Sequence, residues 1–390
     1  MAATNAPVTR QQPSSWRLWV PWVLVVLAAV IGLVSALNIW VKRQALDTNN
    51  FTNASVQLLE DPAVRSAISI YLVDQLYQNV NVAAELEKEL PPQIKGIAAP
   101  LAGALRQLLV RAADTLLSRP RVQQLWKQAV MRAHQLFIAV IDGKRQILQN
   151  TNGNVVLNLR PIVQELEKQG GLLGKVAAQL PPDAGQITIM KGNQLKTART
   201  AVKAIRFLSY FLFFLVIAIY ALAVYLATGR RRQVLMGVGV SAFVVGLIVL
   251  VVRRFAGNYL IDALTKNPIS KPAVGVVWAV ETKLLRNVGI NILIYGFVII
   301  LAAWIAGPSR PARWVRRVLT PTARDHPWVI YGVVALLLLL ILITGPTDGQ
   351  RVYPLLVVFV LAFIGVEVLR RQMLEEFPDA SVGLPPPSAS

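Results

Sequence analysis

The stretch VPWVLVVLAAVIGLVSALNIW, residues 20–40, carries no charged side chain and is long enough to cross a bilayer, which takes about 20 apolar residues. A second stretch of this kind, FLSYFLFFLVIAIYALAVYLA, covers residues 207–227. The interval between them, Lys42–Arg206, contains no apolar run of that length. The two stretches therefore predict a membrane anchor with a large domain inserted after its first span.

The composition points to the same class of protein. Of the 390 residues, 55% are hydrophobic and only 15% are charged, and the mean hydropathy is +0.51. Soluble domains typically carry about 25% charged residues, so this balance indicates a polytopic membrane protein. The sequence contains no cysteine, which excludes disulfides, thiolate catalysis and cysteine-based zinc sites within these residues.

The charge is strongly positive. The formal net charge is +20, from 40 Lys and Arg against 20 Asp and Glu. In a soluble protein this excess would suggest nucleic acid, but the loops expected on the inner side are too short to form a nucleic-acid-binding domain. Much of the arginine lies beside apolar runs, so we expect contact with the bilayer and its anionic headgroups at Arg230–Arg232 and Arg310–Arg317, and no nucleic acid.

Six membrane spans are predicted, at residues 19–41, 207–227, 234–252, 288–306, 329–344 and 354–369. The first is too long for a signal peptide, whose apolar core has about 7–15 residues, and tryptophans flank it at both ends. The third contains small residues at a spacing that permits close helix contact: Gly237, Gly239, Ala242 and Gly246.

The distribution of arginine favours both termini on the cytoplasmic side of a cell membrane. Arg230–Arg232, the arginines of residues 307–328 and Arg370–Arg371 would then face inward. Arg253 and Arg254 run against this rule. The predicted segments outside the spans are a disordered arm 1–18, an extracytoplasmic domain 42–206, an outer amphipathic loop 253–287, a basic cytoplasmic loop 307–328 and a cytoplasmic tail 370–390.

The outer domain shows mostly helical patterns. Asp61 and Pro62 form an N-cap and first-turn pair that opens a helix over Pro62–Tyr77, and further helices are predicted over Glu85–Leu90, Ile97–Leu117 and from Pro120 to Gly143. Alternation around Val155 and Ile187 predicts two short strands, with a helix Pro161–Gln169 between them. The expected fold class is mainly α: a six-helix transmembrane bundle with a helical outer domain that carries a small two-stranded β element.

The sequence offers no starting point for catalysis. It has no Gly-x-Ser-x-Gly, no Walker A lysine loop and no HExxH. Glu85, Glu87 and Glu89 alternate along the chain and do not share one helix face. His134 has no acidic neighbour at helical spacing, and His326 most simply introduces the fifth span. We therefore predict no enzyme, with no catalytic, cofactor-binding or metal-binding residue.

Ionisable residues inside spans, the usual mark of transport, are few. Glu367 lies one turn from Arg370 and Arg371 at the predicted inner interface, where snorkelling explains it. A membrane enzyme acting on lipid would need polar residues near the outer interface, and only Arg253, Arg254 and Glu281 are candidates. That third class is the least favoured.

Four stretches carry a family resemblance: FTNASVQLLEDPAVRSAISIYLVDQLY (residues 51–77), AHQLFIAVIDG (133–143), GRRRQ (229–233) and GVEVLRRQMLEEFP (365–378). Together they resemble uncharacterised actinobacterial-type multi-pass integral membrane proteins. The resemblance implies a bacterial cytoplasmic membrane and transfers no catalytic residue. The order of spans is also similar to that of ABC-2 type export permeases and of half an RND exporter.

Two functions follow as hypotheses. The first is a non-enzymatic envelope scaffold or sensor whose outer domain binds an envelope protein or lipid. The alternative is a transporter or export-permease subunit in which the spans form the pathway and the outer domain acts as a gate. The near-absence of charge in the spans favours the first.

Overall fold

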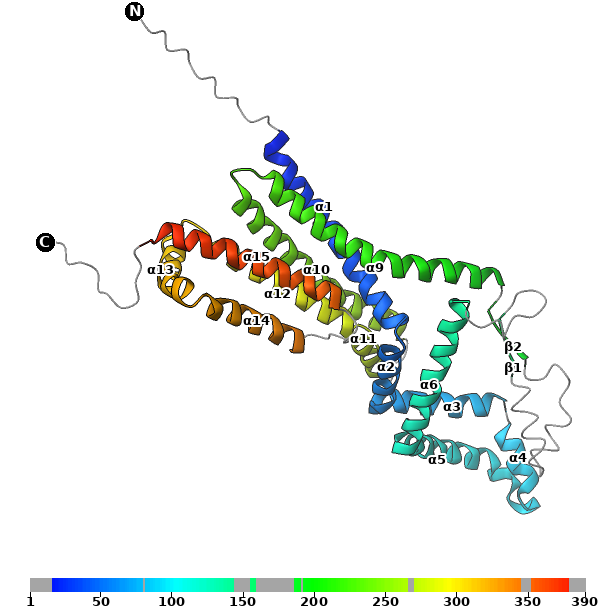
Figure 1. Ribbon diagram of the computed structural model, residues 1–390. Coiled ribbons are helices and arrows are strands. Elements are labelled where there is room, and N and C mark those ends of the chain that lie inside the picture. The colour runs from blue at the N-terminus through cyan, green and yellow to red at the C-terminus, as the bar shows by residue number, and fades with distance from the viewer. Residues whose placement is uncertain are drawn as a thin grey trace, which may run out of the picture. The chain divides into compact units, whose positions relative to one another are not determined.

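A computed structural model describes residues 16–79, 81–143, 155–158, 186–190, 192–265, 270–344 and 352–378 (Figure 1). The chain divides into two compact units. Unit 1 comprises Met1–Leu37, Phe211–Phe255 and Lys283–Ser390, and unit 2 comprises Asn38–Tyr210 and Ala256–Thr282. Three predictions lie outside the described residues: the arm up to Ser15, the helix Pro161–Gln169 and the tail beyond Pro378.

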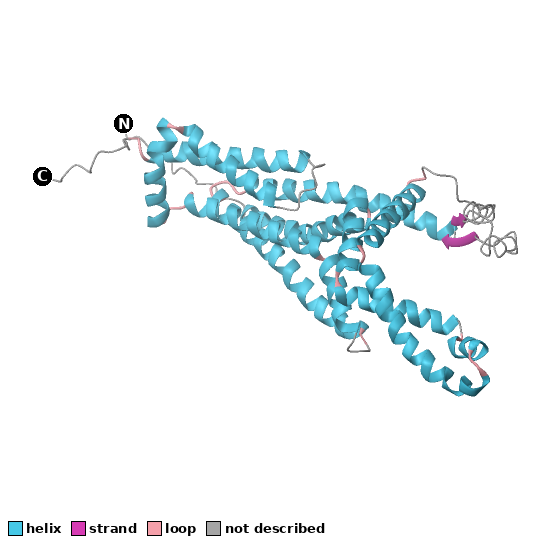
Figure 2. Ribbon diagram, turned by 90° about the horizontal axis from the view of Figure 1, so that it is seen from below, coloured by secondary structure: helices cyan, strands magenta, loops and turns pink. Residues whose placement is uncertain are grey.

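The described chain is mainly helical (Figure 2). Four helices are long and apolar enough to cross a membrane, at Trp19–Ala45, Lys196–Leu226, Arg231–Leu264 and Lys283–Ile305. Between 11% and 33% of the most apolar stretch of each is buried within the protein, so most of this apolar surface faces outward. These properties are those of a membrane protein, as the composition indicated.

Unit 1 is built from the following helices, of which the first three also supply residues to unit 2. They are α1 (Trp16–Ala45), α9 (Gly192–Leu226), α10 (Arg231–Leu264), α12 (Lys283–Ile305), α13 (Arg310–Asp325), α14 (Pro327–Thr344) and α15 (Val352–Glu376). Helix α13 corrects the prediction of a basic loop over residues 307–328. Ser309 and Pro311 flank its first residue, and proline in the first turn of a helix costs no hydrogen bond.

Glycines bring α10 and α12 into backbone contact. A Cβ on Gly246 would lie 2.6 Å from the Leu293 nitrogen and 2.7 Å from the Gly289 oxygen. One heptad away, a Cβ on Gly239 would lie 2.8 Å from the Ile300 nitrogen and 3.1 Å from the Gly296 oxygen. Only glycine fits at such distances, so these four glycines form a seam along which the two helices pack at closest approach.

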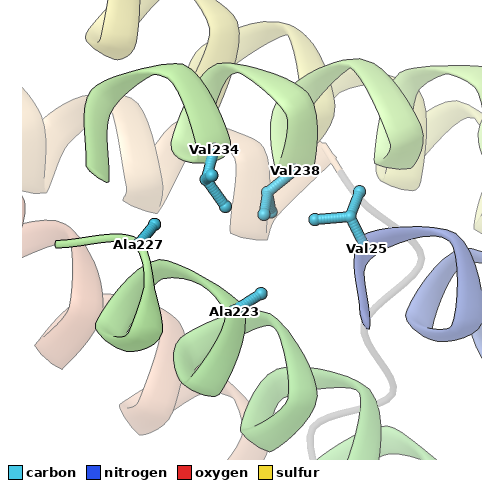
Figure 3. Packing of buried hydrophobic residues seen from close by; sticks show 5 residues of the cluster. All are labelled: Val25, Ala223, Ala227, Val234 and Val238. Carbon is cyan, nitrogen blue, oxygen red and sulfur yellow. The ribbon is translucent and has the colours of Figure 1, made fainter. Parts of the chain in front are cut away.

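A small apolar cluster joins α1, α9 and α10 in the same unit. Its buried members are Val25, Ala223, Ala227, Val234 and Val238, which point toward one another in Figure 3. Small and β-branched side chains again keep the helices close. Nearby, the Tyr220 hydroxyl and the Ser241 hydroxyl share a hydrogen bond of 2.9 Å between α9 and α10.

Unit 2 contains α2 (Thr48–Glu60), α3 (Pro62–Asn79), α4 (Val82–Glu89), the 3-10 helix η1 (Pro92–Ile97), α5 (Ala98–Ser118), α6 (Pro120–Ile141) and α11 (Lys271–Glu281). Its strands β1 (Val155–Asn158) and β2 (Gln186–Met190) pair antiparallel, with Leu157 opposite Ile187. The predicted helix start at Pro62 is confirmed, because the Asp61 carboxylate accepts from the Ala63 amide at 2.9 Å. The start of α6 at Pro120 is confirmed as well.

Polar side chains hold α3 against α5. Arg65 pairs with Asp114 at 3.1 Å, Arg106 pairs with Asp74, and the Tyr77 hydroxyl donates to the Ala102 carbonyl at 2.8 Å. Helix α11 packs on α2 and α3 in the same unit. The last turns of α1 contact the C-terminal residue of α11, Glu281. Gln44 Nε2 donates to Glu281 Oε2 at 2.7 Å, and Trp40 Nε1 donates to the Glu281 carbonyl at 3.1 Å.

Candidate membrane-surface site

Arginines gather at one end of unit 1. Residues 227–232, 306–326 and 367–378 together hold ten arginines, four carboxylates and no lysine. The turn between α9 and α10, helix α13 and the C-terminal end of α15 lie at the same end of the unit (Figures 1 and 2). The sequence places these segments far apart, so the concentration of guanidinium groups is produced by the fold.

At this end, the buried Arg316 links α13 to α15 and to the C-terminal end of α12. Its side chain is 2% exposed and forms a two-point contact with Glu376, with Nε 2.8 Å from Oε2 and Nη2 2.9 Å from Oε1. Its Nη1 also donates to the carbonyls of Ile305 and, at 2.7 Å, of Gly307. A planar guanidinium suits this arrangement, because it can donate to a carboxylate and to carbonyls at once.

Other arginines bind the carbonyl ends of helices. Arg232 Nη1 lies 3.5 Å from the Ala303 oxygen near the end of α12, and Arg370 Nε donates at 3.0 Å to the Ala323 oxygen near the end of α13. Arg324 donates to the carbonyls of Phe377 and Pro378, just beyond α15. The last carbonyls of a helix lack intrahelical partners and carry partial negative charge, so cations stabilise them.

Five arginines of this end are exposed and make no ion pair within the described residues: Arg230, Arg231, Arg310, Arg313 and Arg317. Helix α13 buries Ala312, Thr320 and Ala323 on its inner face. Its outer face exposes Trp314 (67%) and Val318 (55%) beside the arginines. A helix with exposed tryptophan and aliphatic residues next to cations has the features of one that lies in a membrane interface.

The exposed arginines also suit the chemistry of phospholipid headgroups. A guanidinium remains charged, is weakly hydrated and offers a fork of donors that matches phosphate oxygens. Each cation near an anionic membrane surface contributes about 1 kcal/mol of attraction. The arrangement therefore has the donor groups that a phosphate-bearing surface requires. Among the described residues, no group of three or more His, Asp or Glu side chains is placed to hold a metal ion.

His134 occupies a structural position in unit 2. Its ring is 5% exposed, with Nδ1 3.0 Å from the Thr48 hydroxyl and Nε2 3.2 Å from the Ala45 carbonyl. The ring also stacks on Phe51 at 4.4 Å between centroids. Both ring nitrogens are therefore used to attach α6 to the junction of α1 and α2.

The other residues that the sequence offered for catalysis or lipid chemistry do not come together in one site. Glu85 pairs with Lys88 at 2.7 Å on the solvent-exposed side of α4. His326 follows α13 and lies edge-on to Trp328 at 6.4 Å, just before α14 begins. Of the residues considered for lipid chemistry, Arg253 and Arg254 belong to unit 1, whereas Glu281 belongs to unit 2 and is bound by Gln44.

Glu367 has one partner that the sequence pattern did not indicate. It accepts from Arg371 Nε at 2.8 Å, as the spacing of four residues suggests, and also from the Tyr331 hydroxyl at 2.5 Å. The tyrosine contact ties α15 to α14. Helix α13 was likewise missed, although apolar and basic residues alternate through residues 310–325 at helical spacing, which is a detectable signal.

No family model, no curated protein and no solved structure matches this chain.

Proposed function

We propose that the protein is a six-span protein of a bacterial cytoplasmic membrane that presents an extracytoplasmic domain as a non-enzymatic envelope scaffold or sensor. The four apolar helices of sufficient length support the membrane placement. In this proposal α14 and α15 supply the fifth and sixth spans. The outer domain consists of residues 42–206, including the β1–β2 pair, with residues 253–287 on the same side.

The arginine-rich end of unit 1 is the observation that carries the orientation. Cytoplasmic loops are enriched in Lys and Arg, so this end would face the cytoplasm. Helices α1 and α10 begin at this end, and α9 and α12 finish there. The opposite ends of these four helices lead into unit 2, which supports an outer location for it. The exposed arginines of α13 would then contact anionic headgroups of the inner leaflet.

The contacts inside unit 2 support a binding or scaffolding role over a chemical one. Its polar residues are engaged in holding helices together: His134 by Thr48 and Ala45, and Glu281 by Gln44. Asp74 and Asp114 are similarly paired with arginines of the neighbouring helix. These contacts account for the buried and paired polar groups as structural ones, without a catalytic role.

The absence of cysteine makes the orientation easy to test. Single cysteines would be introduced at Gln107 on α5 and at Thr228 in the turn between α9 and α10, both of which are exposed. In intact cells we expect a membrane-impermeant maleimide to label Gln107→Cys and to spare Thr228→Cys, while lysed cells label both. Labelling of Thr228→Cys alone in intact cells would overturn the proposed orientation.

Native purification followed by mass spectrometry tests the role. A scaffold or sensor should carry a stoichiometric envelope protein or tightly held lipid. A co-purifying ATPase, together with substrate flux in proteoliposomes that requires this protein, would replace the scaffold by the alternative, an export-permease subunit gated by the outer domain.

A further inference from the structure

Unit 2 leaves apolar stripes uncovered on two of its helices. On α5, Leu101, Leu108 and Leu116 are 39%, 60% and 52% exposed. On α6, Leu125 is 59% exposed, and the adjacent Trp126, 41% exposed, donates from Nε1 to the Ser55 carbonyl at 3.3 Å. An exposed leucine by itself is ordinary, but the three α5 leucines recur at helical spacing, and such a surface normally meets a partner.

Cations accompany these stripes. Residues 98–141 contain six basic residues and a single carboxylate, Asp114, which is already paired with Arg65. Five of the basic residues are exposed and make no ion pair within the described residues: Arg111, Arg119, Arg121, Lys127 and Arg132. The exposed residues of each of these two helices are therefore both apolar and positively charged, and residues 98–141 hold almost no opposing charge.

The order of residues along α6 shows how the two properties combine. Arg121, Leu125, Arg132 and Leu136 follow one another at intervals of four, seven and four residues, so they lie along one line of the helix. Long basic side chains at the edge of an apolar stripe can direct their charge to phosphate while their alkyl stems and the leucines enter the acyl boundary.

We propose that α5 and α6 of unit 2 form a second membrane contact, which binds the anionic surface of a bilayer. Charge complementarity selects this occupant. A second copy of the chain would oppose one basic surface to another, which is unfavourable. A bilayer offers both anionic headgroups and an apolar layer, and the membrane helices of the same chain keep one nearby. The inference rests on the proposed function only in assigning this bilayer face to the outer leaflet.

The test measures the depth of single spin labels in the full-length, cysteine-free protein in lipid nanodiscs. Leu108→Cys and Leu125→Cys report on the two stripes. Their sequence neighbours Gln107→Cys and Gln124→Cys, also exposed, are matched controls that point away from the stripes. Relative accessibility to oxygen, which concentrates in lipid, and to a water-soluble nickel chelate gives the depth of each label.

In nanodiscs containing phosphatidylglycerol, we expect the labels at 108 and 125 to favour oxygen and to lie about 5–10 Å within the interface. The labels at 107 and 124 should remain accessible to the nickel chelate. Discs of phosphatidylcholine alone should weaken the contrast, as should Arg121→Gln with Arg132→Gln in phosphatidylglycerol discs. Unchanged thermal unfolding of that variant in detergent separates a lost contact from a lost fold.

Two results would overturn the proposal. Equal exposure of all four labels to the nickel chelate would mean that no bilayer covers the stripes. Protection of 108 and 125 from both reagents would mean that protein covers them, and dipolar broadening between labels would then identify a second copy. Both leaflets of a nanodisc are accessible and identical, so these outcomes do not depend on the orientation tested by maleimide labelling.

Discussion

The two units hold their helices together in different ways. In unit 1, α10 and α12 meet through glycines, with Gly246 against Gly289 and Gly239 against Gly296. In unit 2, α3 and α5 are joined by long side chains, such as Arg65 reaching Asp114. Lipid tails are as apolar as leucine, so no hydrophobic effect drives helices together in a membrane. Membrane helices therefore associate through close packing. A domain in water can use ion pairs to align helices, but each pair contributes little.

A branched side chain in the glycine seam should have the largest effect. In Gly246→Leu, the new side chain meets the backbone of α12, which cannot move aside as a flexible side chain would. We expect a loss of at least about 3 kcal/mol, the upper end of the range for overpacking, and little monodisperse protein. Size-exclusion chromatography after heating in detergent measures this.

Gly332→Leu is the matched control for the seam. A Cβ at Gly332 on α14 would meet nothing within 4 Å among the described residues, so the variant should behave like the parent. If Gly246→Leu were equally well tolerated, close glycine packing would not be what holds α10 and α12 together in unit 1.

Removing the buried guanidinium of Arg316 should cause the second-largest loss of stability. Arg316→Met leaves Glu376 and the carbonyls of Ile305 and Gly307 without their donor. Breaking a buried pair costs about 3–5 kcal/mol, and because Glu376 is 29% exposed we expect about 2–3 kcal/mol. Thermal unfolding in detergent reports the change. Arg317→Met, one residue along and exposed, should shift stability by no more than about 0.5 kcal/mol.

His134→Phe should have an intermediate effect in unit 2. The ring keeps its stacking on Phe51 but loses its contacts with Thr48 and Ala45, leaving part-buried polar groups unsatisfied. We expect a loss of about 1–2 kcal/mol, measured as faster proteolysis of unit 2 in the full chain. Gln135→Ala, at the exposed neighbouring position, controls for position on the helix. A stable His134→Phe variant would mean that packing, and not the two hydrogen bonds, fixes α6.

The smallest effect is expected for the exposed cross-link between α3 and α5. A double-mutant cycle with Arg65→Ala and Asp114→Ala should give a coupling of about 0.2–1 kcal/mol that decreases as salt is added, because the carboxylate is 39% exposed. A coupling several times larger and independent of salt would show that this pair behaves as a buried one, and the two units would then differ less than the contacts suggest.

Much of the helical structure was predictable because its signals are local. Asp61 and Pro62 start α3, and Pro120 starts α6, through geometry confined to one turn. Of the six predicted spans, four coincide with helices long and apolar enough to cross a membrane. Residues 310–325, predicted as part of a basic loop, are helical. Their basic and apolar residues recur at helical spacing, and the charged Arg316 lies on the inner face, where an apolar residue is the usual signal.

The partners of the arginines were not predictable in the same way. Nothing near Arg316 in the sequence points to Glu376, 60 residues away, or to the end of α12. By itself, the sequence determined several helix starts and the most apolar segments, because caps and apolar length act over a few residues. Only the tertiary structure decided which arginines bind the carbonyls of helix ends and which remain exposed, since that depends on which helix ends meet.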